Sequence, residues 1–124
     1  IGHSDGDVIL HSLIDAFLGT KSNGDIGTYF PALKKYKDIS SDILFNENKK
    51  NIKFEEILIN NIDITIICQK IRLEKYKNKI KNNISKLCKC NSEIINVKAK
   101  TADKVGTIGK SKAIACWVTV TITE

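Results

Sequence analysis

The stretch Ile1-Gly2-His3-Ser4-Asp5-Gly6-Asp7-Val8-Ile9-Leu10-His11-Ser12-Leu13-Ile14-Asp15 opens an amphipathic helix around which the chain is organised. Ser4 and Asp5 are favoured N-cap residues, and Gly19 is a natural C-terminal stop. Between them, apolar residues recur at helical spacing. These apolar residues are Leu10, Leu13, Ile14, Phe17 and Leu18. The pattern predicts one helix from about Ser4 to Gly19, with its apolar face turned to the core.

Polar residues form a second pattern on this helix. Asp7, His11 and Asp15 are each four residues apart and therefore form a stripe along the edge of the apolar face. His3 precedes the helix at its positive end, where anions bind. One histidine is thus placed for a phosphate and the other for a metal ion. The residues alone leave two alternatives open: a histidine paired with a neighbouring Asp, and acids that only cap the helix.

The composition indicates one globular domain over residues 1–124, with 42% hydrophobic and 27% charged residues. The net charge of +6 suits a phosphorylated small substrate. The lysines are spread along the chain without interleaved aromatic residues, so we expect no nucleic-acid partner. No apolar run is long enough to span a membrane, so we expect no membrane partner.

Four cysteines, Cys68, Cys88, Cys90 and Cys116, are interpreted as free thiols in a reducing compartment. The spacing of Cys88 and Cys90 is C-x-C, which is not a zinc knuckle. The chain begins without Met at a motif that looks functional. We therefore expect that a further N-terminal segment precedes it.

The rest of the chain predicts a small α+β fold. After a loop over 20–31 and a basic flap over 32–40, Ser40 or Ser41 caps a helix that carries Ile43, Leu44 and Ile52. The further expected elements are a strand over Ile57–Cys68 in the sheet interior, a helix over 73–90, a strand over Ile94–Lys100 and a central strand over Ile114–Thr123. This order predicts helices packed on one face of a small mixed β-sheet, with a βαβ crossover.

Two loops carry groups that suit phosphates and metal ions. Gly24 and Gly27 flank Asp25 and allow a ligand to approach the backbone closely. The stretch Thr101–Lys110 holds hydroxyls, a carboxylate, lysines and glycines, which are the groups that a diphosphate–magnesium unit needs. Gln69–Arg72 adds two cations after the first strand, and a plain solvated strand end is the alternative there.

Together these motifs resemble the 2-C-methyl-D-erythritol 2,4-cyclodiphosphate synthase family of the non-mevalonate isoprenoid pathway. The likeness runs from one end of the chain to the other, and its H-S-D-G-D-x-x-x-H signature is very specific. The matching stretches are His3-Ser4-Asp5-Gly6-Asp7-Val8, Leu10-His11, Asp15-Ala16, Leu18-Gly19, Gly24-Asp25-Ile26-Gly27, Phe30-Pro31, Asn61-Ile62-Asp63, Asn96-Val97-Lys98-Ala99, Thr101, Lys104, Gly106, Gly109 and Ile114-Ala115.

The resemblance implies a homotrimeric lyase with active sites between neighbouring subunits and a hydrophobic cavity near the threefold axis. The implied substrate is 4-diphosphocytidyl-2-C-methyl-D-erythritol 2-phosphate. Its own 2-phosphate attacks the β-phosphorus, closes a cyclic diphosphate and expels CMP. A zinc ion and a magnesium (or manganese) ion supply positive charge, and protein groups position the phosphates.

Individual roles follow from the resemblance, residue by residue. His11 would bind zinc with Asp7 and Asp15 near it, and Asp103 would reach magnesium. His3 and Thr101 would stabilise the transition state. The substrate-binding residues would be His3 and Ser4 at the 2-phosphate; Asp25, Ile26 and Gly27 at the erythritol hydroxyls; Phe30 and Pro31 at the flap; Cys68, Arg72 and Leu73 around cytosine and its phosphates; and Lys100, Thr101, Ala102, Asp103, Thr107 and Lys110 at the diphosphate.

The chain also departs from the family pattern. The family's Asp-x-His zinc ligands lie on an N-terminal strand that would precede Ile1, and Asp103 stands where the family has the longer Glu. An alternative is therefore a non-catalytic trimeric relative that binds nucleotides or isoprenoid diphosphates. The pathway and the AT-type coding bias favour a plastid of the apicoplast kind after removal of a transit peptide, and otherwise the cytoplasm.

Overall fold

A computed structural model describes residues 3–29, 40–68, 73–101 and 114–124. The order of elements is α1 (His3–Thr20), α2 (Ile26–Tyr29), α3 (Ser41–Asn48), β1 (Leu58–Ile67), α4 (Lys77–Cys88), β2 (Ile95–Lys100) and β3 (Ala115–Thr123). Short 3-10 turns lie at Phe54–Glu56, Leu73–Tyr76 and Ser92–Ile94. Among the described helices, none is long and apolar enough to cross a membrane.

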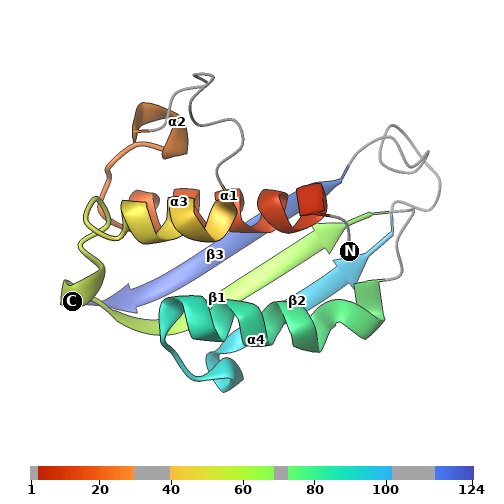
Figure 1. Cartoon of the computed structure of the whole chain (residues 1–124). Helices are drawn as coiled ribbons and strands as arrows, with labels where there is room; N and C mark the ends of the chain where they lie inside the picture. Colours follow the sequence, from red (N-terminus) through yellow and green to blue (C-terminus); the bar gives the residue numbers. More distant parts are fainter. Residues whose placement is uncertain (1–2, 30–39, 69–72, 102–113) are drawn as a thin grey trace.

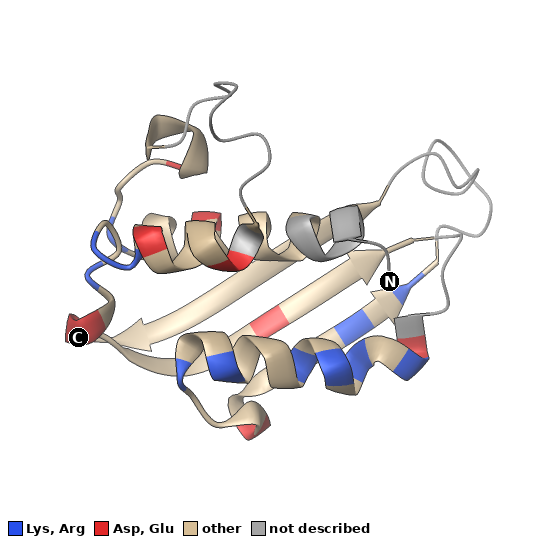
Figure 2. Ribbon diagram, viewed as in Figure 1, with Lys and Arg blue, Asp and Glu red and all other residues tan. Residues whose placement is uncertain are grey.

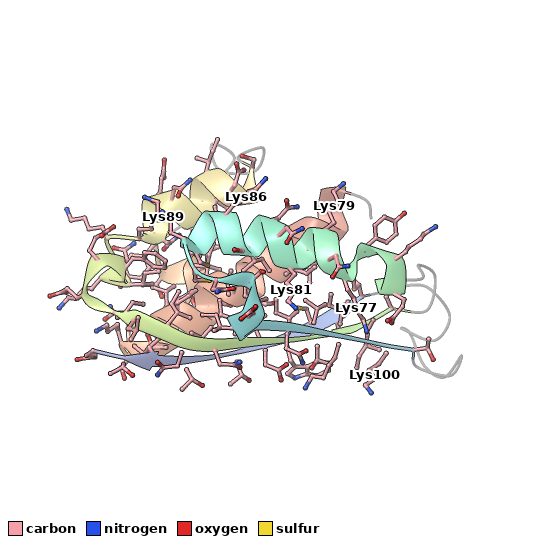
Figure 3. The ribbon with its side chains drawn as sticks, turned by 90° about the horizontal axis from the view of Figure 1, so that it is seen from below. Lys77, Lys79, Lys81, Lys86, Lys89 and Lys100 are labelled. Carbon is pink, nitrogen blue, oxygen red and sulfur yellow. The ribbon has the colours of Figure 1, made fainter. Side chains whose placement is uncertain are left out.

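The described strands form one mixed sheet in the order β2-β1-β3 (Figure 1). β1 runs parallel to β2, with α4 as the crossover between them, and antiparallel to β3. The helices α1, α3 and α4 lie on one face of this sheet (Figures 1 and 3). The predicted α+β architecture, its βαβ crossover and the interior position of the Ile57–Cys68 strand are confirmed.

The prediction that the last strand is central was wrong. β3 pairs with β1 and lies at the edge of the described sheet. β1 takes the centre because its crossover through α4 brings β2 to one edge, which leaves the other edge for β3. On β3 every second side chain, at Val118, Val120 and Ile122, packs against the core, and Trp117 faces the other way with 58% exposure.

α1 is longer at both ends than its sequence pattern predicted. His3 is the first residue of the helix rather than a residue before it, so Ser4 and Asp5 are not its N-cap. At the other end the left-handed residue is Ser22 (φ 54°) instead of Gly19. The N–H of Ser22 bonds to Gly19 O and the N–H of Asn23 to Leu18 O, which is the bonding of a Schellman motif.

Three aromatic rings build one end of the core. Phe17 on α1, Phe45 on α3 and Phe54 lie 5.7–5.9 Å apart between ring centroids, in edge-to-face pairs. α3 ends at Asn48, so Ile52 is buried from the following turn and not from the predicted helix. Ile43, predicted for the apolar face, is 49% exposed, and Phe45 is fully buried instead.

The predicted helix over 73–90 divides into a 3-10 turn and α4. Ile80, Ile84 and Cys88 form the buried stripe of α4. Lys79 and Lys86 point away from the sheet, whereas Lys77 and Lys81 are partly buried on the side of α4 that faces the sheet; α4 contains no acid (Figures 2 and 3). The interpretation of the lysines as a solvated outer face is confirmed for Lys79, Lys86 and Lys89, which are exposed, but not for Lys77 and Lys81. The lysines labelled on and beside α4 in Figure 3 are Lys77, Lys79, Lys81, Lys86 and Lys89.

Candidate active site

After α1 the chain turns and runs back along the same helix. The Schellman motif at Ser22 reverses its direction, and the N–H of Ile26 then donates a hydrogen bond to Asp15 Oδ1 at 2.7 Å. His11 lies one helical turn before Asp15, and both side chains are exposed. The structure therefore brings Asp15, one member of the predicted stripe on α1, into contact with the predicted hydroxyl-binding loop at Asp25–Gly27. The side chain of Asp7, the third member of the stripe, lies outside the described residues.

The loop at Asp25–Gly27 contains a hydrogen-bonded helical turn that its composition did not predict. Residues 26–29 form the single-turn helix α2 where we expected only a loop. Asp25 Oδ1 accepts hydrogen bonds from the N–H (3.1 Å) and the hydroxyl (3.2 Å) of Thr28. Asp25 thus caps α2 with one carboxylate oxygen, and Oδ2 takes no part in these bonds.

The two glycines of the loop leave little room for a side chain. Gly24 has φ +77°, and a Cβ on it would lie 3.0 Å from Thr28 Oγ1. A Cβ on Gly27 would lie 3.3 Å from Asp25 Oδ1. Both glycines therefore keep the capped carboxylate of Asp25 accessible to its hydrogen-bond partners.

A second group of predicted residues meets at the carboxyl ends of the two parallel strands. The N–H of Cys68, just after β1, donates to the carbonyl of Lys100 at the end of β2 (3.1 Å). Thr101 follows and is exposed. Ligands commonly bind outside the carboxyl ends of parallel strands. α1 begins toward this same end of the molecule (Figure 1).

Several predicted residues lie outside this geometry. Leu73 begins the 3-10 turn that leads to α4, and its side chain is not described. The same holds for the side chains of His3 and Ser4 in the first turn of α1. The predicted residues that lie outside the described residues altogether are Phe30, Pro31, Arg72, Ala102, Asp103, Thr107 and Lys110.

The described residues do not by themselves make a metal site. Within 3–29, 40–68, 73–101 and 114–124, no three His, Cys, Asp or Glu side chains gather closely enough to hold an ion. His11 is the one imidazole described there, and zinc takes roughly three or four protein ligands. These residues thus supply one candidate zinc ligand, on an exposed turn of α1.

The cysteines are not arranged as nucleophiles. All four are free thiols, as predicted. Burial raises the pKa of Cys88 to about 12, and burial also raises the pKa of Cys90 and Cys116. Because the thiolate is the reactive form, these three thiols stay protonated and inert at neutral pH.

Comparison with known proteins identifies the family. A sequence model of the YgbB family matches residues 1–123. The chain belongs to the YgbB family. The chain is 47% identical over 116 residues to the 2-C-methyl-D-erythritol 2,4-cyclodiphosphate synthase of Wigglesworthia glossinidia brevipalpis, covering 93% of this chain and 73% of that protein. The resemblance found in the sequence is thereby confirmed.

Two other members of the family extend this likeness. The bifunctional enzyme IspD/IspF of Pelagibacter ubique is 50% identical over 123 residues, which are 98% of this chain and 33% of that enzyme. The structure of Plasmodium falciparum IspF in complex with CDP superposes with a TM-score of 0.82 at 36% identity, covering 98% of this chain and 74% of that chain. The chain thus spans about a third of the bifunctional family member and about three quarters of the single-function ones.

The sequence did not predict the contact between Asp15 and the Asp25–Gly27 loop. Asp15 was interpreted as a neighbour of a zinc ligand, whereas its carboxylate accepts from the Ile26 N–H. Ile26 was expected at the substrate hydroxyls, but its N–H is occupied by Asp15. The sequence signal for this contact is weak, because nothing in the spacing of residues 15 and 26 predicts that the loop folds back.

Proposed function

We propose that the protein converts 4-diphosphocytidyl-2-C-methyl-D-erythritol 2-phosphate into 2-C-methyl-D-erythritol 2,4-cyclodiphosphate and CMP. The observation that carries the proposal is the 47% identity to a synthase of that name across 93% of this chain. The geometry is compatible with it, because the loop at Asp25–Gly27 bonds to α1 at Asp15, one helical turn after His11. Such a loop offers a carboxylate and accessible backbone to a polyol.

The chemistry is an internal phosphoryl transfer. An oxygen of the 2-phosphate forms a bond to the β-phosphorus, and the bond from that phosphorus to the bridging oxygen breaks, so CMP leaves with the bridging oxygen. Such a reaction depends on positioning and charge neutralisation more than on a protein nucleophile. In this proposal His3 and Thr101 stabilise the transition state, while Lys100 contributes positive charge near the diphosphate.

The substrate groups divide between two regions of the chain. The erythritol end belongs to α1 and the Asp25–Gly27 loop, and the nucleotide end belongs to Cys68, Lys100 and Thr101 after β1 and β2. We place the complete site between subunits of a homotrimer. Supporting this, the sheet face opposite the helices carries the exposed Trp117, and no described element covers that face (Figure 3).

The proposal includes zinc and magnesium (or manganese) as cofactors, because His11 has the chemistry of a zinc ligand and stands on an exposed turn. The ions would supply charge to the phosphates. We expect His11→Ala to lower the zinc content of the purified protein, measured by mass spectrometry of the metal. Unchanged zinc in that variant would contradict the assignment of His11.

The reaction is tested by phosphorus NMR of the cytidyl substrate with protein, zinc and magnesium. We expect resonances of CMP and a cyclic diphosphate. The variant Thr101→Val should slow turnover, whereas Glu47→Gln, at an exposed residue of α3 on the helix-covered side of the sheet, should not. CDP binding without any product would overturn the enzymatic proposal and favour a non-catalytic relative that binds nucleotides.

A further inference from the structure

The hydrogen bond between Asp15 and Ile26 links the two segments of the erythritol end of the proposed site. Asp15 lies on α1, eleven residues before Ile26, and its Oδ1 accepts from the Ile26 N–H at 2.7 Å. A hydrogen bond to an ionised carboxylate is stronger than one between neutral groups. It joins the one-turn helix α2 to the long helix α1.

α2 is held to the rest of the molecule by few contacts: the side chains of Ile26 and Tyr29 are partly buried against the core, and the Ile26 N–H bonds to Asp15. It contains four residues and no buried one, and a helix of one turn does not persist in isolation. Its first N–H groups also need acceptors. Asp25 Oδ1 supplies one for Thr28, and Asp15 Oδ1 supplies one for Ile26. The second acceptor comes from another element, so it fixes where α2 lies and not only how it is capped.

From this geometry we infer that Asp15 is a positioning residue, which holds the Asp25-Ile26-Gly27 segment against the turn of α1 that follows His11. The inference rests on the proposed function for its catalytic consequence. It differs from the earlier interpretation of Asp15 as a support for a zinc ligand, because the carboxylate is directed to a backbone N–H of the loop. Asp15 itself does not need to contact substrate.

A direct test is hydrogen exchange of the Ile26 amide in the free protein. Asp15→Ala removes the acceptor, so we expect the Ile26 amide to exchange at least about tenfold faster, the effect of losing one hydrogen bond to a charged group. Asp15→Asn keeps an oxygen in place and should restore much of the protection. Glu47→Ala removes an exposed acid from α3 and should leave Ile26 unchanged.

Kinetics then separate positioning from a merely structural role. Asp15→Ala should raise KM for the cytidyl substrate by about tenfold, with Asp15→Asn in between. Affinity for CDP, which lacks the erythritol end, and zinc content should equal those of the unaltered protein. Loss of zinc with unchanged Ile26 exchange would overturn the inference and restore the metal-supporting role.

The two proposals fail in different ways. If the unaltered protein binds CDP but forms no product, the proposed function fails, while the exchange of Ile26 still decides whether Asp15 holds the loop. If the protein turns over normally and Asp15→Ala changes neither exchange nor KM, the positioning role is wrong and the function stands. Asp15 is exposed, so its variants should fold, and a thermal melt of each checks this.

Discussion

The ammonium group of Lys98 on β2 lies 2.7 Å from Asp63 Oδ2 on the neighbouring strand β1. Asn96 donates to the other oxygen, Oδ1, at 3.0 Å. Asp63 alternates with the buried Ile62 and Ile64, so this cluster lies on the sheet face that the described helices leave uncovered. The cluster of Asp63, Asn96 and Lys98 joins the parallel strands β1 and β2 through side chains that point away from the core.

The cluster predicts a specific dependence of stability on pH. The hydrogen bonds from Lys98 and then Asn96 lower the pKa of Asp63. A lowered pKa in the folded state stabilises the protein above the unfolded pKa of Asp, about 3.9, and this contribution is lost as pH falls through the folded value. Asp63→Asn should therefore cost up to about 1 kcal/mol at pH 7, since the side chain is 33% exposed and solvent screens the pair.

Urea unfolding of the unaltered protein and Asp63→Asn between pH 2 and 7 measures this difference. The two curves should converge at the acid end. Lys98→Gln and the double variant complete a mutant cycle, in which the coupling should vanish at high salt. A difference that stays constant down to the lowest pH would show that the charge of Asp63 contributes nothing.

The aromatic cluster predicts a much larger effect. Phe45 is fully buried and its ring lies 5.9 Å from that of Phe17 and 5.8 Å from that of Phe54. Phe45→Ala should lower the free energy of unfolding by about 3–5 kcal/mol through lost transfer energy and a cavity. Ile43→Ala on the same helix is the matched control, because Ile43 is 49% exposed and should change stability by less than about 0.5 kcal/mol. Similar losses in both variants would contradict the packing of α3.

The end of α1 predicts a stabilising substitution. Ser22 has φ 54°, a left-handed conformation that is unfavourable for a residue with a Cβ. Ser22→Gly should raise the free energy of unfolding by about 0.5–1 kcal/mol. Ser22→Ala keeps the Cβ and should give no gain, which separates the backbone effect from loss of the hydroxyl. If glycine is no better than alanine at this position, the left-handed cap is wrong.

Local periodicity predicted much of the fold. The alternation of Ile62, Ile64 and Ile66 places their side chains on the helix-covered face of β1, and the helical spacing of Ile80 and Ile84 marks the buried stripe of α4. Both patterns can be read from the sequence, because each depends only on the regular spacing of buried side chains along a single strand or helix. The order of elements then restricted the sheet to a small number of topologies.

Local periodicity did not predict the contacts between residues that lie far apart in the sequence. Nothing local distinguishes a central from an edge position for β3, since both show one apolar face. The left-handed Ser22 turn, the burial of Phe45 and the contact from Asp15 to Ile26 each depend on where the chain returns after a turn. The family signature predicted which segments make up the candidate site, and only the structure showed which of the described segments lie together.

The exposed Trp117 predicts which surface joins the subunits. It is the only tryptophan of the chain and is 58% exposed on the uncovered face of the sheet, opposite Thr65 in the register of β1 and β3. Large exposed apolar residues on such a face are typical of subunit contacts. In the proposed homotrimer Trp117→Glu should lower the mass measured by light scattering, because it adds a charge to a buried contact.

Ile43→Glu provides the matched control, because Ile43 is also exposed but lies on α3 at the other side of the molecule. That variant should keep the trimer mass. Since Trp117 is the only tryptophan, its emission should shift to longer wavelength when the unaltered protein is diluted until it dissociates. A trimer that survives Trp117→Glu, with emission that does not change on dilution, would mean that another surface joins the subunits.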